Sequence, residues 1–180
     1  MAPKDGPELE GMLRLAISLG QPAAIRYPRA ALPEFPAKPD SSNALALGKA
    51  EVLREGPDGA VLAYGSLVKE ALAAAEIAAG KGKNLTVVNL RFAKPLDEEL
   101  ILGLAQKMPA MFTVEEHALA GGVGSAVAEL LADRNALPRK LIRLGVPDRF
   151  IEHGSRSELL RELGLDASGL ADTILGNLFS

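Results

Sequence analysis

The sequence predicts an α/β protein with a mostly parallel sheet. Strand-like and helix-like segments alternate from about residue 46 to the C-terminus, which is the pattern of parallel βα units. Leu85–Leu90 is a β-branched, apolar run typical of a buried strand. The short turn Gly56-Pro57-Asp58-Gly59 separates two strand-like segments. Because parallel strands need a long crossover between them, this turn indicates that one strand is antiparallel.

The N-terminal segment predicts one helix followed by one strand. Asp5 is the expected N-cap, and Glu8 completes a capping box three residues later. Apolar residues then recur at helical spacing until Gly20. The apolar run Ala23–Tyr27 predicts a strand that Pro28 ends. One helix and one strand are too few for an independent core, so we expect this segment to pack on something else.

A proline-rich stretch divides the chain. Residues 30–43 are rich in proline, serine and alanine, with Pro33, Pro36 and Pro39 equally spaced, which is typical of a linker. The division that follows is an N-terminal segment over residues 1–30, a linker over 31–45 and a domain over 46–180.

The domain after the linker is expected to contain five strands and five helices. The strands are predicted over 49–54, 60–64, 85–90, 111–114 and 141–144, and the helices over 66–79, 97–108, 125–134, 155–163 and 168–178. Ser66, Asp97 and the Ser155/Glu158 pair are the expected N-terminal caps. The apolar stripe on helix 66–79 is wider than one core face needs. It predicts self-association of the domain through an apolar helix or sheet-edge surface or, alternatively, burial of the helix on two sides within one subunit.

Composition excludes several classes of protein. The net charge is −3 and no basic block occurs, so nucleic acid is not an expected partner. No run approaches the roughly 18 apolar residues that a membrane span needs. Cysteine is absent, which excludes disulfides and thiolate chemistry and is compatible with the cytoplasmic location that we expect.

Most motif candidates favour structural interpretations. Gly121-Gly122-Val123-Gly124 lacks the G-x-G-x-x-G spacing, and Gly80-Lys81-Gly82-Lys83 lacks the first glycine and the Ser/Thr of a phosphate loop, so both predict turns. His117 and His153 have no second ligand at metal spacing, and we expect them at the surface or an interface. The stretch 115–117 does lie just past a strand end, where α/β proteins place functional groups. We identify no catalytic, cofactor-binding or metal-binding residue in the chain.

Two arginines near the end of the first predicted strand are the sharper candidates. Arg26 can offer two parallel N–H donors to a phosphate group. Arg29 lies three residues later, so in an extended segment it points to the opposite face. The alternative interpretation is that both are ordinary surface arginines.

An ordered series of segments resembles the C-terminal third of the 1-deoxy-D-xylulose-5-phosphate synthase family. The series comprises residues 1–5 (MAPKD), 24–29 (AIRYPR), 89–97 (NLRFAKPLD), 113–117 (TVEEH), 121–125 (GGVGS) and 145–154 (GVPDRFIEHG). The resemblance covers nearly the whole chain. It implies that residues 1–30 are the end of a pyrimidine-binding domain. It also implies that residues 46–180 form a transketolase C-terminal domain, with one antiparallel strand and helices on both faces of the sheet.

The resemblance also implies a function. Enzymes of this family use thiamine diphosphate and Mg²⁺ to condense pyruvate with glyceraldehyde 3-phosphate, releasing CO₂, for isoprenoid, thiamine and pyridoxal synthesis. Arg26 is expected to bind the substrate phosphate, and Tyr27 and Arg29 are expected to flank that site. The family's Gly-Asp-Gly magnesium motif and its activating glutamate are missing from this sequence, so the chain alone is expected to be inactive and to bind no cofactor. The expected partners are the N-terminal domains of the same polypeptide and a second subunit in a homodimer. The alternative is a non-catalytic dimerisation or assembly domain of another transketolase-like or 2-oxo acid dehydrogenase enzyme.

Overall fold

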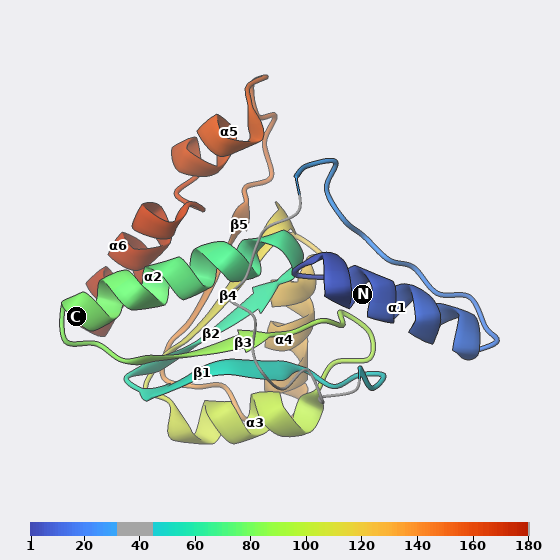
Figure 1. Cartoon of the computed structure of the whole chain (residues 1–180). Helices are drawn as coiled ribbons and strands as arrows, with labels where there is room; N and C mark the ends of the chain where they lie inside the picture. Colours follow the sequence, from blue (N-terminus) through green and yellow to red (C-terminus); the bar gives the residue numbers. More distant parts are fainter. Residues whose placement is uncertain (32–44, 180) are drawn as a thin grey trace.

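A computed structural model describes residues 1–31 and 45–179 as a mixed sheet between two layers of helices (Figure 1). Within the described residues the sheet has five strands in the order β1-β3-β2-β4-β5. The strands are β1 (Glu51–Pro57), β2 (Gly59–Tyr64), β3 (Leu85–Asn89), β4 (Met111–Ala118) and β5 (Leu141–Val146). The predicted α/β class and mostly parallel sheet are therefore confirmed.

The antiparallel strand is β1, but its neighbour is β3 and not β2, from which only Asp58 separates it in the sequence. β3 lies between β1 and β2 and runs parallel to β2. The backbone N–H of Asp58 donates to the carbonyl of Asn84 at 2.9 Å, and the Asp58 carboxylate accepts the Asn84 N–H at 2.6 Å. The short turn is therefore bonded to the residue before β3. The turn predicted one antiparallel strand correctly, and tertiary pairing decided where that strand lies.

Helices cover both faces of the sheet. They are α1 (Gly6–Ser18), α2 (Val68–Gly80), α3 (Glu98–Lys107), α4 (Val123–Asp133), α5 (Arg156–Glu162) and α6 (Ala167–Leu178). One core joins α2, α5 and α6 to β2, β3 and β4. A second core joins α3 and α4 to the opposite face. Among the described residues, no helix combines the length and apolar character needed to cross a membrane.

The wide apolar stripe of α2 is used inside this chain. Val68, Ala71, Ala74, Ala75 and Ala78 are fully buried, and α2 contacts α6 as well as the sheet. Small alanine side chains allow α6 to approach α2 while α2 still packs on β2 and β3. For these residues the structure supports the alternative interpretation, burial on two sides within one subunit, whereas Ile77 on the same helix is 38% exposed.

Some predicted caps are confirmed and others are wrong. Asp97 and the Ser155/Glu158 capping box begin α3 and α5 as expected. Ser66 does not cap α2, because a 3₁₀ turn over Gly65–Leu67 precedes the helix and the Ser66 hydroxyl donates elsewhere. Asp5 does cap α1, but the Glu8 side chain does not complete a capping box there.

The Glu8 side chain instead enters a buried ionic cluster. Its carboxylate accepts hydrogen bonds from Arg91 Nε at 2.7 Å, from Asn89 Nδ2 at 2.9 Å and from the Lys4 backbone N–H at 2.7 Å. Glu51 on β1 pairs with Arg91 Nη2 and with Lys4 Nζ, both at 2.9 Å. The attraction of Arg91 and Lys4 outweighs the opposing effect of burial, so the pKa of Glu51 lies below its ordinary value. Residues from the N-terminal segment, β1 and β3 thus meet in one cluster, which fastens the segment to the domain.

The predicted strand over residues 23–27 is wrong. This segment is irregular, and most of its side chains are exposed. Its backbone makes two bonds to Met1: the Arg26 N–H donates to the Met1 carbonyl at 3.0 Å, and the Met1 nitrogen donates to the Ala24 carbonyl at 2.9 Å. Two such bonds hold the segment extended without making a sheet ladder. Most of the predicted linker, including its three prolines, lies outside the described residues.

We predict that Glu8→Ala releases α1 from the domain. Removing the carboxylate leaves Arg91 with only part of its compensating charge in a buried site, and breaking a buried pair costs about 3 kcal/mol or more. Hydrogen exchange measured at the α1 amides should show a loss of protection of about that size.

Glu10→Ala is the matched control, because it removes a carboxylate from the same helix whose partner, Arg14, is also exposed. Its effect should stay below about 0.5 kcal/mol. Equal effects of the two substitutions would contradict a fastening role for the cluster.

Candidate functional site

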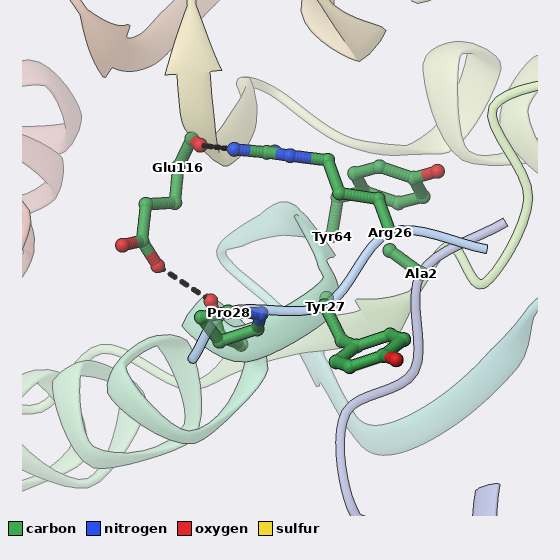
Figure 2. Close-up of a pocket in the computed structure, with 8 residues that line it drawn as sticks. Ala2, Arg26, Tyr27, Pro28, Tyr64 and Glu116 are labelled. Carbon is green, nitrogen blue, oxygen red and sulfur yellow. Dashed lines mark hydrogen bonds between the residues drawn. The ribbon is translucent and has the colours of Figure 1, made fainter. Parts of the chain in front are cut away.

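A pocket lies where the Arg26 segment crosses the carboxyl ends of β2 and β4 (Figure 2). This is the edge of a parallel sheet at which α/β proteins bind ligands. The pocket is lined by Ala2, Arg26, Tyr27, Pro28, Tyr64, Gly65, Ser66 and Glu116. Its volume is about 50 Å³, well below the roughly 300–1,000 Å³ of a complete small-molecule site. The described residues can therefore hold one end of a ligand.

Arg26 contributes a cation with unused donors. Nη2 donates to the backbone carbonyl of Glu116 at 2.6 Å, which directs the side chain across the pocket (Figure 2). An arginine has five N–H donors, and within the described residues Nε and Nη1 have no hydrogen-bond partner. The backbone at Arg26 is held in place by the two hydrogen bonds between this segment and Met1. The arrangement therefore suits an oxyanion such as phosphate.

The Glu116 carboxylate points away from Arg26 (Figure 2). It accepts two hydrogen bonds from Arg156 Nε at 2.8 and 3.1 Å, one from Arg156 Nη2 at 2.5 Å and one from the Ser66 hydroxyl at 2.6 Å. Burial favours the neutral acid. The bonds from Arg156 and Ser66, together with the charges of Arg156 and Arg26, outweigh this effect and hold the pKa of Glu116 below its ordinary value. Glu116 is therefore ionised at neutral pH, and its carboxylate is bound by Arg156 and Ser66.

Tyr64 forms the wall at the end of β2. Burial raises the pKa of its phenol above the ordinary value, although a hydrogen bond with the Ala93 backbone and the nearby Arg26 charge act in the opposite direction. The side chain therefore stays neutral at physiological pH, and because its hydroxyl bonds to the Ala93 backbone, Tyr64 offers the pocket its aromatic ring.

Of the three residues singled out in the N-terminal segment, two line the pocket and one does not. Arg26 and Tyr27 line the pocket, although the Tyr27 side chain is 61% exposed. Arg29 is exposed and does not line the pocket. His117 and His153 are also exposed, and His117 Nδ1 lies 3.1 Å from the Ala118 carbonyl. In the part of the chain that the structure describes, no group of acidic or histidine side chains is arranged to hold a metal ion.

Sequence reasoning missed Tyr64, Ser66, Glu116 and Arg156. Position 116 had a signal, because it lies just past the predicted end of a strand, but the expected functional group there was not specified. Arg156 had none, since it reaches Glu116 from 40 residues away in the sequence.

The loop over residues 121–124 binds an internal carboxylate. The N–H groups of Val123 and Gly124, at the start of α4, donate to Glu115 at 2.7 and 2.8 Å. A Cβ at position 122 would lie 2.3 Å from a Glu115 oxygen, so glycine is needed for this close approach. The prediction of a tight strand-to-helix turn is confirmed. The N-terminus of α4 binds the Glu115 side chain and not an external anion.

Comparison with known proteins gives the class first. Residues 48–170 match the transketolase C-terminal domain, so the chain belongs to that family. The chain is 50% identical over 175 residues to 1-deoxy-D-xylulose-5-phosphate synthase of Caldanaerobacter subterraneus subsp. tengcongensis, covering 97% of the chain and 28% of that enzyme. It is 51% identical over 176 residues to the synthase of Synechococcus sp. strain JA-2-3B'a(2-13), covering 97% of the chain and 27% of that enzyme. The chain therefore spans just over a quarter of the length of these curated relatives.

Solved structures agree with the fold. A split-gene transketolase, described as an inactive β4 tetramer, superposes with a TM-score of 0.89 at 31% identity, covering 99% of this chain and 57% of that one. The transketolase of Campylobacter jejuni superposes with a TM-score of 0.67 at 23% identity, covering 97% of this chain and 25% of that one. The second likeness shows the fold alone.

The depressed pKa of Glu116 predicts a pH-dependent contribution to stability. A carboxylate whose pKa is lower in the folded than in the unfolded chain stabilises the fold above its unfolded pKa, near 4.3, and this contribution is lost as the pH falls through the folded pKa. Glu116→Gln should lower the free energy of unfolding at pH 7 by at most about 1 kcal/mol, because the pair with Arg156 is partly exposed.

Urea titrations from pH 7 to pH 3 should show the difference between wild type and Glu116→Gln shrinking with the pH. Glu129→Gln, which removes an exposed carboxylate from α4, measures the effect of surface charge alone. A Glu116→Gln difference that grows below pH 4 would contradict the assignment.

Proposed function

We propose that this chain is the C-terminal part of a thiamine-diphosphate-dependent synthase that condenses pyruvate with glyceraldehyde 3-phosphate and releases CO₂. The product would be 1-deoxy-D-xylulose 5-phosphate, a precursor for isoprenoid, thiamine and pyridoxal synthesis. The observation that supports this most is about 50% identity to two such synthases over 97% of the chain. The proposed location is the cytoplasm.

The proposed domain division is the end of a pyrimidine-binding domain over residues 1–30, a linker over 31–45 and the transketolase C-terminal domain over 46–180. Exposed apolar side chains on the N-terminal segment support it. Leu13 and Ile17 lie one turn apart on α1, with exposed fractions of 49% and 83%, and Tyr27 is 61% exposed. In the proposed enzyme, the rest of the pyrimidine-binding domain would cover this face.

Thiamine diphosphate and Mg²⁺ would be held by the domains that precede this segment in the relatives. The sequence contains no Gly-Asp-Gly motif followed by asparagines. When bound, the cofactor supplies the carbanion chemistry of the condensation. The proposed partners of this segment are those domains, a second subunit of a homodimer and the two small substrates.

Within this enzyme we assign Arg26 to the phosphate of glyceraldehyde 3-phosphate. Three features support the assignment: two guanidinium nitrogens without partners among residues 1–31 and 45–179, a backbone held by Met1 and a pocket that can take only one end of a ligand. Tyr27 lines the same pocket and flanks the proposed phosphate site, whereas Arg29 does not line it. No residue of this chain is assigned to bond making or breaking.

Arg26→Ala in the complete enzyme should raise the KM for the phosphorylated aldehyde and spare the KM for pyruvate. A charge-assisted contact is worth about 1.5–3 kcal/mol, so kcat/KM should fall roughly 10- to 100-fold. Arg26→Lys should recover only part of the loss, because lysine keeps the charge without the paired donors.

Arg29→Ala is the control for that experiment, since Arg29 lies in the same segment but outside the pocket. Damage from Arg29→Ala with a silent Arg26→Ala would mean that the wrong arginine is assigned. Two silent variants would place the phosphate elsewhere.

The 180-residue chain alone should bind no thiamine diphosphate and show no synthase activity. Anchoring the diphosphate through Mg²⁺ and activating the ring need groups that the sequence lacks. Calorimetric titration with thiamine diphosphate and Mg²⁺ is the measurement, and micromolar binding by the chain would refute the expectation.

A further inference from the structure

Two oppositely charged side chains of the pocket are not paired with each other. Arg26 and Glu116 interact electrostatically, yet the guanidinium bonds to the backbone carbonyl of Glu116 and not to its carboxylate. A carboxylate and a phosphate compete for the same parallel N–H donors of an arginine. The Glu116 carboxylate belongs to the same residue as the carbonyl that Arg26 contacts, so its effective concentration near Arg26 is high. Something must therefore keep the Glu116 carboxylate away from Arg26 if a phosphate is to bind.

Arg156 is the group that holds it. Its guanidinium makes three contacts of 2.5–3.1 Å with the Glu116 carboxylate, and Ser66 adds one neutral donor. The carboxylate is thereby drawn to the side opposite Arg26 (Figure 2). Both charged side chains are partly buried, with exposed fractions of 24% for Glu116 and 36% for Arg156, so the pair is only partly shielded from bulk water.

The fold fixes Arg156 firmly. It is the first residue of α5, directly after the Ser155 N-cap, whose capping box with Glu158 defines the start of the helix. Leu160, one turn later, is buried in the core shared with α2 and α6. The guanidinium is therefore presented to the end of β4 from a rigid base.

We propose that Arg156 is a positioning residue for the phosphate site: by binding the Glu116 carboxylate, it leaves the Arg26 guanidinium free for the substrate phosphate. The proposal rests on the proposed role of Arg26. It adds that α5, near the C-terminus, controls a binding group on the N-terminal segment. Without Arg156, the Glu116 carboxylate turns to Arg26 and competes with the phosphate.

The test uses the 180-residue chain and the ¹⁵Nε–H signal of Arg26 in NMR spectra. D-glyceraldehyde 3-phosphate is the titrant, and unphosphorylated D-glyceraldehyde is the ligand control. Arg156→Met should weaken binding about fivefold, as expected for release of one partly exposed charge. The double variant Arg156→Met/Glu116→Gln should return to within about twofold of wild type, because the competing charge is gone.

Arg161→Met is the matched control variant. It removes an exposed arginine from the same helix, with the same change in net charge and no hydrogen bond to Glu116. Arg161→Met should bind D-glyceraldehyde 3-phosphate like wild type. This result would distinguish an effect of Arg156 on the Glu116 carboxylate from a general effect of the lost positive charge. Thermal unfolding of each variant shows that the fold is kept.

The outcomes separate the two proposals. If Arg26→Ala abolishes binding while Arg156→Met binds like wild type, the positioning role is overturned and the phosphate site stands. If the double variant binds as weakly as Arg156→Met, then Arg156 does not act through Glu116, and the positioning role is again overturned. If the wild-type chain binds and Arg26→Ala binds equally well, the phosphate site itself is contradicted, and if the wild-type chain does not bind, the pocket needs the other domains of the enzyme to hold the ligand. The ligand-free Arg26 signal then decides the positioning claim: it should shift in Arg156→Met and return in the double variant, and an unshifted signal overturns the claim.

Discussion

The pocket depends on one residue, Glu116, which bonds through its backbone and its side chain in opposite directions. The carbonyl accepts Arg26 from the N-terminal segment, and the carboxylate accepts Ser66 from the turn before α2 and Arg156 from α5. A parallel strand end is a suitable place for such a junction, because its last residues leave the ladder and their polar groups become available. Three segments distant in the sequence meet there and give the pocket its shape.

The segment that bears Arg26 needs a second attachment, because it has little core of its own. The Glu8–Arg91 pair supplies it, together with Lys4 and Glu51. Arg91 has a left-handed backbone, with φ of 57°, and its carbonyl accepts the Ala2 N–H at 2.9 Å. Ala2 in turn lines the pocket, and its neighbour Met1 bonds to the Arg26 backbone. The buried ionic cluster and the pocket are thus linked by a short, continuous series of backbone bonds.

Sequence reasoning succeeded where local patterns decide the structure. Alternation of strands and helices predicted the parallel sheet, and local capping rules located the starts of α3 and α5. Sequence reasoning failed where the structure of a segment depends on a residue far away in the sequence. Glu8 satisfies the spacing of a capping box, but Arg91, 83 residues later, binds its carboxylate instead. Residues 23–27 have the composition of a strand, but within the described part of the chain their backbone bonds only to Met1. Arg26 was identified from its motif and a family resemblance, whereas its connection to Arg156 through Glu116 exists only in three dimensions.

The central claim is that Arg26 is the phosphate-binding group of a synthase whose other domains complete the site. The most direct test is a crystal structure of the complete enzyme with glyceraldehyde 3-phosphate bound. The account predicts phosphate oxygens within hydrogen-bond distance of Arg26 Nε and Nη1, with the Glu116 carboxylate still on Arg156. A phosphate bound away from Arg26, with the Arg26 guanidinium paired to the Glu116 carboxylate, would contradict it.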